Sequence, residues 1–149
     1  MIARPIKVQD IQQVSEILRE FRSEEISPDY MKSGEEHTVM VERLLIQYFF
    51  PTSWLVENKG EIIAVLIAHK AAMPLTPSAV VIEEVVFYVR EAYRNTRAGY
   101  ILFKAWTDYA KRLRNNGEVN AILMHTLADS PIDMTKHGFK ELQTTFVME

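Results

Sequence analysis

The sequence contains no cysteine among its 149 residues. This excludes disulfide bonds, thiolate metal sites and cysteine nucleophiles, and it agrees with a reducing compartment. No apolar run approaches the ~18–20 residues that a membrane-spanning helix needs. The first ten residues, MIARPIKVQD, lack the apolar core of a secretory signal. We therefore expect a cytoplasmic protein with no membrane partner.

The chain also lacks an excess of charge of either sign and has no internal repeat. Its net charge is −3, which gives no indication of nucleic-acid binding. Hydrophobic residues make up 48% and charged residues 25%, as in ordinary globular proteins. This length and composition predict a single domain spanning residues 1–149.

Two kinds of site are missing from the sequence. The four histidines, His37, His69, His125 and His137, share no metal-ligand spacing, so we expect no metal cofactor. There is also no elbow motif of the serine hydrolases.

The pattern of apolar residues and turn signals predicts ten elements in one α+β (mixed α/β) domain. Helices are expected from Asp10 onward, over residues 39–49, from Gly99 to Arg114 and from Ser130 to Gly138. The predicted strands are Ile2–Ile6, Ser53–Val56, Glu61–Ala68, Ala79–Val89, Ala121–Met124 and Phe139–Met148. The element order is strand, helix, helix, three strands, helix, strand, helix, strand, which favours a mixed sheet with helices.

The segment Val81–Tyr109 combines an apolar strand, an arginine-bearing turn and an amphipathic helix. The first backbone N–H groups of a helix have no partner within it, and the helix dipole favours an anion there. Two acids, Glu83 and Glu84, lie on the strand just before this turn. The segment therefore predicts an anion site with a proton acceptor nearby.

Glu83 and Glu84 are adjacent, so on a regular strand their side chains face opposite sides of the sheet. Regular alternation would put Glu83 on the same face as Val85, Phe87 and Val89. A carboxylate in a cleft could accept a proton from a bound molecule. The alternative for these two acids is that one forms a structural ion pair and the other is exposed.

Several local motifs together resemble the GNAT superfamily of acyl-CoA-dependent N-acetyltransferases. They are Arg4-Pro5 with Asp10, the hairpin Trp54–Ile63, the segment Val89–Arg94 and the closing Lys136-His137-Gly138-Phe139. The resemblance covers nearly the whole chain. It implies a mostly antiparallel sheet of six to seven strands with about four helices, acetyl-CoA as co-substrate, and an amine acceptor. Homodimers are common in this family.

The pyrophosphate-binding loop of the family reads Gln/Arg-x-x-Gly-x-Gly/Ala, and Arg94–Gly99 is similar to it. Arg97 replaces the middle glycine. An arginine can keep the same backbone path if its φ is negative, and its charge suits phosphate. This Arg-x-x-Arg-x-Gly form resembles phage-type members. A solvated helix N-terminus with two surface arginines is the alternative.

The resemblance also implies roles for individual residues. Glu83 matches the general base of the family, and Glu84 is the second candidate. The strand backbone at Phe87, Tyr88 and Val89 would hold the pantetheine arm, with an N–H near Phe87 stabilising the oxyanion. The implied diphosphate-binding residues are Arg94, Asn95, Thr96, Arg97, Ala98, Gly99 and Tyr100.

Two positions depart from the family. Met134 stands where a tyrosine usually protonates the leaving thiolate, and Leu127 replaces an asparagine. Ser130 or His125 could supply the proton instead, although a helix cap and a local hydrogen bond are the simpler roles for them. These departures leave open a non-catalytic acyl-CoA-binding or protein-interaction module, or a plain structural subunit. The acceptor, a small molecule or a protein, is not identified by the sequence.

Overall fold

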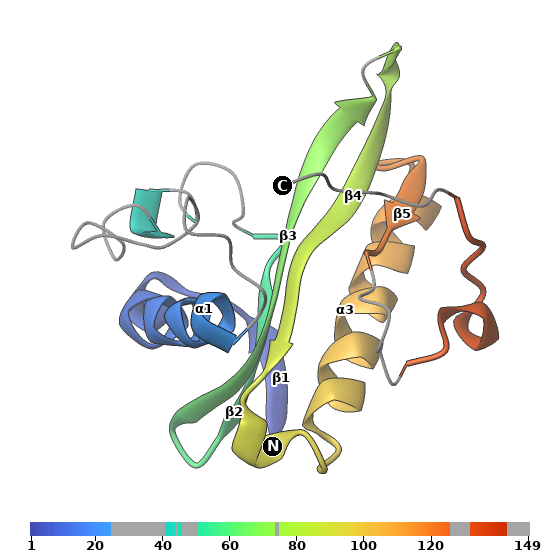
Figure 1. Ribbon diagram of the computed structural model, residues 1–149. Coiled ribbons are helices and arrows are strands. Elements are labelled where there is room, and N and C mark those ends of the chain that lie inside the picture. Colours follow the sequence, from blue (N-terminus) through green and yellow to red (C-terminus); the bar gives the residue numbers. More distant parts are fainter. Residues whose placement is uncertain (25–40, 44, 46–50, 74, 126–131, 143–149) are drawn as a thin grey trace, which may run out of the picture.

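The structure, a computed structural model, describes residues 1–24, 41–43, 45, 51–73, 75–125 and 132–142. Its centre is a curled five-stranded sheet in which the strands lie in sequence order (Figure 1). The strands are β1 (Ile2–Pro5), β2 (Trp54–Asn58), β3 (Glu61–Met73), β4 (Thr76–Val89) and β5 (Ala121–Leu123). β1 to β4 pair antiparallel, whereas β4 and β5 pair parallel.

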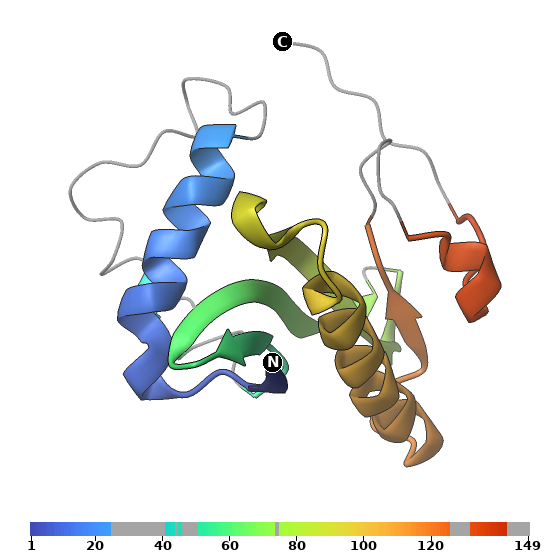
Figure 2. The same cartoon turned by 90° about the horizontal axis from the view of Figure 1, so that it is seen from below.

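Two helices cover opposite faces of this sheet, as the view along it shows (Figure 2). The first, α1 (Ile11–Glu24), packs Val14 and Ile17 against Val65 and Ile67 of β3. The second, α3 (Ala98–Asn115), packs its apolar face against the other side of β3 and β4. The buried side chains of α3 include Leu102, Phe103, Trp106, Ala110 and Leu113. Each face of the sheet therefore has its own hydrophobic core.

Local sequence signals account for the main turns. Lys59 (φ 53°) and Gly60 (φ 86°) form the two-residue loop between β2 and β3, which is the backbone conformation that a tight hairpin requires. Gly117 (φ 77°) follows α3, and the next residue, Glu118, donates its N–H to the carbonyl of Leu113. This is the left-handed helix ending for which glycine is favoured.

Asp10 was predicted to cap the first helix, but it lies inside a short 3-10 turn, Val8–Asp10, that precedes α1. Its buried carboxylate accepts hydrogen bonds from the N–H of Lys7 and from two nitrogens of Arg4. The Arg4 guanidinium keeps the pKa of Asp10 below its usual value. Asp10 therefore fastens β1 to the start of α1.

Strand β4 contains one extra residue. Ile67 of β3 pairs with Val86, and the next residue, Ala68, pairs with Glu84, so that Val85 is left over as a β-bulge. The side chain of Val85 is exposed. Because of this bulge, the alternation of faces along β4 reverses after Glu84.

Some predicted elements differ from the structure. The described residues contain five strands rather than six to seven, and Phe139–Leu142 is not a strand. The helix expected from Ser130 is, in its described part, a single 3-10 turn, Met134–His137, that ends at Gly138 as predicted. Of the second predicted helix, Val41–Arg43 is helical. Residues 143–148 and Ser130 lie outside the described residues. Among the helices that are described, none is long and apolar enough to cross a membrane.

Glu84 is a buried acid in the core on the α3 side of the sheet. Only 2% of its surface is exposed, and Ile82 and Ala68 on the same face belong to the hydrophobic cluster around it. Burial raises the pKa of Glu84 to about 7, although a hydrogen bond from the N–H of His125 opposes this. The charged form of Glu84 therefore destabilises the fold.

Replacing Glu84 with Gln should alter how stability depends on pH. The folded protein holds the Glu84 proton up to pH about 7, whereas the unfolded chain releases it near pH 4.5. Between these values the free energy of unfolding should fall as pH rises, by up to about 3 kcal/mol from this one group. E84Q should lack that fall and be the more stable protein at pH ~8.

Urea denaturation across this pH range measures the effect. The matched control is E118Q, because Glu118 forms an exposed ion pair with Lys70 and exposed pairs contribute at most about 1 kcal/mol. An E84Q curve that runs parallel to the wild-type curve at every pH would show that the Glu84 carboxyl is not buried.

Candidate functional site

The site lies where β4 and β5 stop pairing. The three parallel pairs between these strands are Val81 with Ala121, Ile82 with Ile122 and Glu83 with Leu123. β4 continues for another six residues, to Val89, and no described strand pairs with this continuation on the β5 side. The backbone of β4 from Glu84 onward thus has an open edge next to the last pair.

Glu83 stands at this point between two histidines. The Nε2 atom of His69, on β3, lies 3.2 Å from Oε2 of Glu83, and the Nε2 atom of His125 lies 2.8 Å from Oε1. Burial alone would raise the pKa of Glu83, but the hydrogen bonds from His125 and His69 outweigh it and the pKa is lowered. Because an ionised carboxylate only accepts hydrogen bonds, both Nε2 atoms carry protons.

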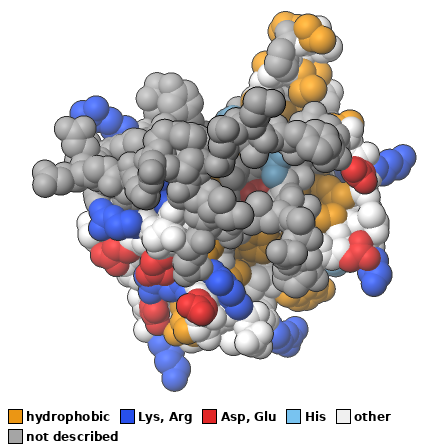
Figure 3. All heavy atoms as spheres, viewed as in Figure 1, with side chains coloured by type: hydrophobic (Ala, Val, Ile, Leu, Met, Phe, Trp, Pro, Cys, Tyr) orange, Lys and Arg blue, Asp and Glu red, His pale blue; other side chains and the backbone are white. Residues whose placement is uncertain are grey.

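The three side chains of this His69–Glu83–His125 cluster are accessible. The exposed fractions are 30% for His69, 29% for Glu83 and 53% for His125. On the face shown in Figure 3, a histidine and an acidic side chain lie together near the centre, beside hydrophobic side chains. The cluster can therefore exchange protons with a molecule bound at the open edge of β4.

Because of the bulge at Val85, the neighbours of the two acids on each face of the sheet differ from those predicted. Glu83 faces the α1 side, with Val86 and Tyr88, whereas Glu84 faces the α3 side, with Phe87. The predicted alternation, which put Glu83 with Phe87 and Val89, is wrong because a strand with one extra residue reverses its faces. Glu84 is buried, and it accepts a 3.0 Å hydrogen bond from the backbone N–H of His125.

Sequence reasoning missed the role of His69. A regular hairpin that includes the pair Met73–Thr76 would set His69 opposite Val80. A register shift between Ala72 and Met73 moves the pairing by three residues and sets His69 opposite Glu83. Pro74 and Pro77 in the connection favour irregular pairing, but they do not indicate the size of the shift.

The arginine turn runs directly into α3. Arg97, at the N-cap of the helix, has φ −80°, so it keeps the negative φ expected of an arginine at the usual glycine position. Thr96 accepts a hydrogen bond from the N–H of Ala98 and donates one to the carbonyl of Tyr93. A Cβ added to Gly99 would meet Cγ2 of Val89 at 3.4 Å, so the helix start packs closely on the end of β4.

The two arginines of the turn differ in their surroundings. The guanidinium of Arg94 lies 5.3 Å from the centre of the Tyr88 ring, and its Nε donates to the carbonyl of Val89. Arg97 is exposed at the start of α3. Of the remaining predicted diphosphate-binding residues, Asn95 and Tyr100 are exposed and Ala98 is buried.

The predicted departures from the family are only partly described. Met134 begins the 3-10 turn before Gly138, and a thioether sulfur has no proton to donate. Ser130 and Leu127 lie outside the described residues. Within the part of the chain that the structure describes, no group of three or more His, Cys, Asp or Glu side chains could hold a metal ion.

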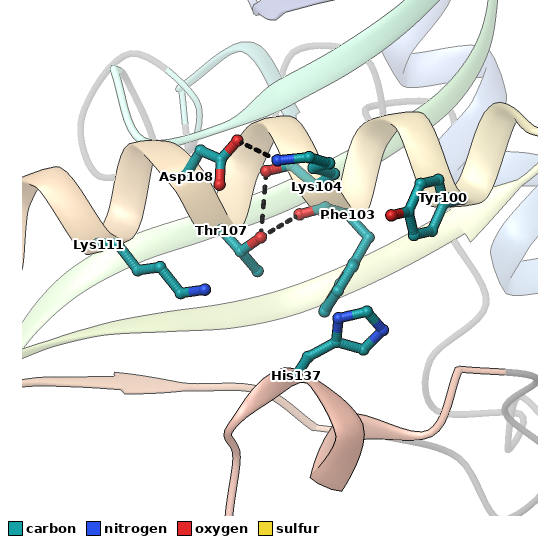
Figure 4. Close-up of a pocket in the computed structure, with 7 residues that line it drawn as sticks. All are labelled: Tyr100, Phe103, Lys104, Thr107, Asp108, Lys111 and His137. Atoms are coloured by element: carbon teal, nitrogen blue, oxygen red, sulfur yellow. Dashed lines mark hydrogen bonds and ion pairs between the residues drawn. The ribbon is translucent and has the colours of Figure 1, made fainter.

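A separate small cavity lies on the outer side of α3, beside His137 (Figure 4). Its volume is about 110 Å³, and it is lined by Tyr100, Phe103, Lys104, Thr107, Asp108, Lys111 and His137. Ligand pockets usually measure about 300–1,000 Å³, so this cavity is too small to hold a whole acyl-CoA. It shares no residue with the His69–Glu83–His125 cluster.

Comparison with solved structures identifies the same fold in several acetyltransferases. A ribosomal-protein-alanine N-acetyltransferase from Brucella melitensis biovar Abortus 2308 aligns with a TM-score of 0.65 at 13% identity, over 99% of this chain and 97% of that one. An acetyltransferase from Trypanosoma brucei aligns with a TM-score of 0.70 at 11% identity, covering 99% and 98%.

An aminoglycoside acetyltransferase from an uncultured soil metagenomic sample, in complex with sisomicin, aligns with a TM-score of 0.72 at 11% identity, covering 99% and 95%. No curated protein matches the sequence significantly. The family described as "Acetyltransferase (GNAT) family" matches residues 11–139. This match spans most of the chain and agrees with the fold: the chain belongs to the GNAT acetyltransferase family.

Proposed function

We propose that this protein transfers an acetyl group from acetyl-CoA to a primary amine by direct attack. The observation that carries the proposal is the position of the Glu83 carboxylate, which lies between two histidines at the point where β4 parts from β5. An extended thioester arm can lie along the open edge of β4 and hydrogen-bond to the strand backbone. The acetyl carbon would then lie close to a proton-accepting cluster.

The residues around this edge fit an acyl-CoA co-substrate. The backbone at Phe87 and Val89 would hold the pantetheine arm, although the carbonyl of Val89 already accepts a hydrogen bond from Arg94. The N–H groups at the start of α3 and the exposed side chain of Arg97 would bind the diphosphate. A backbone N–H near Phe87 would stabilise the negative oxygen of the tetrahedral intermediate.

Glu83 would take part in removing protons from the amine. A primary ammonium must lose a proton before its nitrogen can attack, and a carboxylate whose pKa is lowered is a weak acceptor by itself. The side chain of Glu83 is partly exposed, so it can pass the proton on to solvent. Glu84 is an unsuitable acceptor because it is almost fully buried on the opposite face.

The names of two similar structures suggest which amines to test first as acetyl acceptors. One similar structure is named for an aminoglycoside and another for a ribosomal-protein alanine, so a small amine and a protein N-terminus are both suitable first substrates. The alternative of a non-catalytic acyl-CoA-binding or protein-interaction module is not favoured, because the matched family and these structures are named as acetyltransferases.

Replacing Glu83 with Gln should lower kcat by about 10²- to 10⁴-fold, the usual effect of losing a general base. KM for acetyl-CoA should change little, since the carboxylate does not bind the cofactor arm. Release of free CoA measures both constants with a panel of a polyamine, an aminoglycoside, an amino acid and a peptide. E118Q, a Glu→Gln change at an exposed ion pair, is the control.

Three results would count against the proposal. An E83Q protein as active as wild type would place the proton acceptor elsewhere. Tight binding of acetyl-CoA without turnover of any amine would favour the non-catalytic module. No binding of acetyl-CoA would exclude both readings and leave a structural subunit.

Replacing Arg97 with Ala should raise KM for acetyl-CoA about five- to tenfold while kcat at saturation stays near the wild-type value. Loss of one exposed charge-assisted hydrogen bond to phosphate corresponds to about 1–1.4 kcal/mol. Arg97 is preferred to Arg94, whose contacts with Tyr88 and Val89 would add a structural effect.

The control for R97A is R112A, an exposed arginine in the last turn of the same helix. Initial rates at varied acetyl-CoA concentration, at two salt concentrations, give the comparison. Equal KM values for R97A and R112A would show that Arg97 does not contact the diphosphate.

A further inference from the structure

His125 is held by both acids of β4. Its ring Nε2 lies 2.8 Å from Oε1 of Glu83, and its backbone N–H donates a 3.0 Å hydrogen bond to Oε2 of Glu84. One carboxylate thus orients the ring while the other fixes the main chain. The half-exposed side chain still reaches solvent, which distinguishes it from a histidine buried for packing.

The position of His125 is next to the open edge of β4. Glu83 pairs with Leu123 in the last parallel pair, and His125 follows two residues later, where the strands have parted. If a thioester arm lies along this edge with its carbonyl oxygen near the N–H of Phe87, as proposed above, its sulfur lies beside the part of β4 that follows Glu83. His125, two residues past the last parallel pair, lies beside the same part of β4.

The leaving thiolate needs a proton. Simple thiols have a pKa of ~8.5, so a thiolate is a better leaving group when a donor protonates it as the bond breaks. Met134, at the position of the usual tyrosine, has no proton to give. With Nε2 of His125 turned to Glu83, the nitrogen left to deliver a proton is Nδ1, which carries one when both ring nitrogens are protonated.

We propose that His125 protonates the departing CoA thiolate, with Glu83 and Glu84 as its positioning residues. This inference rests on the proposed function. The ammonium loses one proton to Glu83 and thence to solvent. The amine nitrogen then bonds to the acetyl carbon, the nitrogen loses its second proton, and the C–S bond breaks. The sulfur takes the proton from Nδ1 of His125. The second proton of the nitrogen passes to solvent, and Nδ1 of His125 regains one from solvent, so the balance is amide, free thiol and one proton released.

The test replaces sulfur with selenium in the acetyl donor. A selenol is a much stronger acid than a thiol, so a selenolate leaves without protonation, whereas both donors have nearly the same shape. H125N should lose about 10²-fold in kcat with acetyl-CoA, at the lower end of the general-acid range. With the acetyl ester of seleno-CoA it should keep a rate close to that of wild type. The control is H137N, because His137 lies beside α3, away from the cluster.

The losses in kcat of H125N with the two donors decide whether His125 protonates the thiolate. Equal losses with both donors would overturn the proposal, since a damaged fold or a base role for His125 affects both alike. No loss with either donor would also overturn it. In both cases wild-type turnover leaves the proposed function standing. If wild-type protein transfers acetyl to no amine, the proposed function itself fails and the role of His125 fails with it.

A measurement without any substrate tests the geometry. Nitrogen-15 NMR of the free protein should show the His125 ring protonated at Nε2, and E83Q should change those ring signals. In E84Q the ring signals should persist while the backbone amide of His125 shifts, because Glu84 contacts only the main chain. Ring signals of His125 that are the same in E83Q and wild type would show that Glu83 does not orient it.

Discussion

The parting of β4 and β5 after the Glu83–Leu123 pair is the constraint on which the rest of the site depends. The parallel pairing of β4 and β5 brings His125 next to the two acids. Because this pairing stops after Leu123, the following edge of β4 is free for another extended chain. The two helices fix this geometry from opposite faces, because each buries its own apolar cluster against β3. Neither helix supplies a member of the His69–Glu83–His125 cluster; their packing holds the strands that do.

Two neighbouring carboxylates acquire opposite electrostatic character at this point. Hydrogen bonds from two imidazoles keep Glu83 ionised, while the apolar α3 side raises the pKa of Glu84 to about 7. Adjacent acids whose environments separate their pKa values are typical of sites that move protons. The sheet achieves this separation simply by giving the two side chains different faces.

Features controlled by nearby residues could be predicted from the sequence. The hairpin Trp54–Ile63, the helix from Gly99 to Arg114 and the pair of acids before an arginine turn depend on backbone conformation and short-range periodicity. The contact of His69 with Glu83 depends on a register shift across two long strands, and no local pattern encodes the size of that shift. The short turn before Gly138 was overpredicted as a helix, because a cap and a stop signal fix the ends of an element but not its type.

The bulge at Val85 has a consequence for how this strand can vary. The identity of the bulged residue matters little, since its side chain is in solvent. Its presence matters greatly, because removing one residue would exchange the faces of the side chains on one side of the bulge. Either Phe87 and Tyr88 would each face the opposite hydrophobic core, or Glu83 and Glu84 would exchange faces. We therefore expect position 85 to accept many side chains, whereas this stretch of β4 should accept no insertion or deletion.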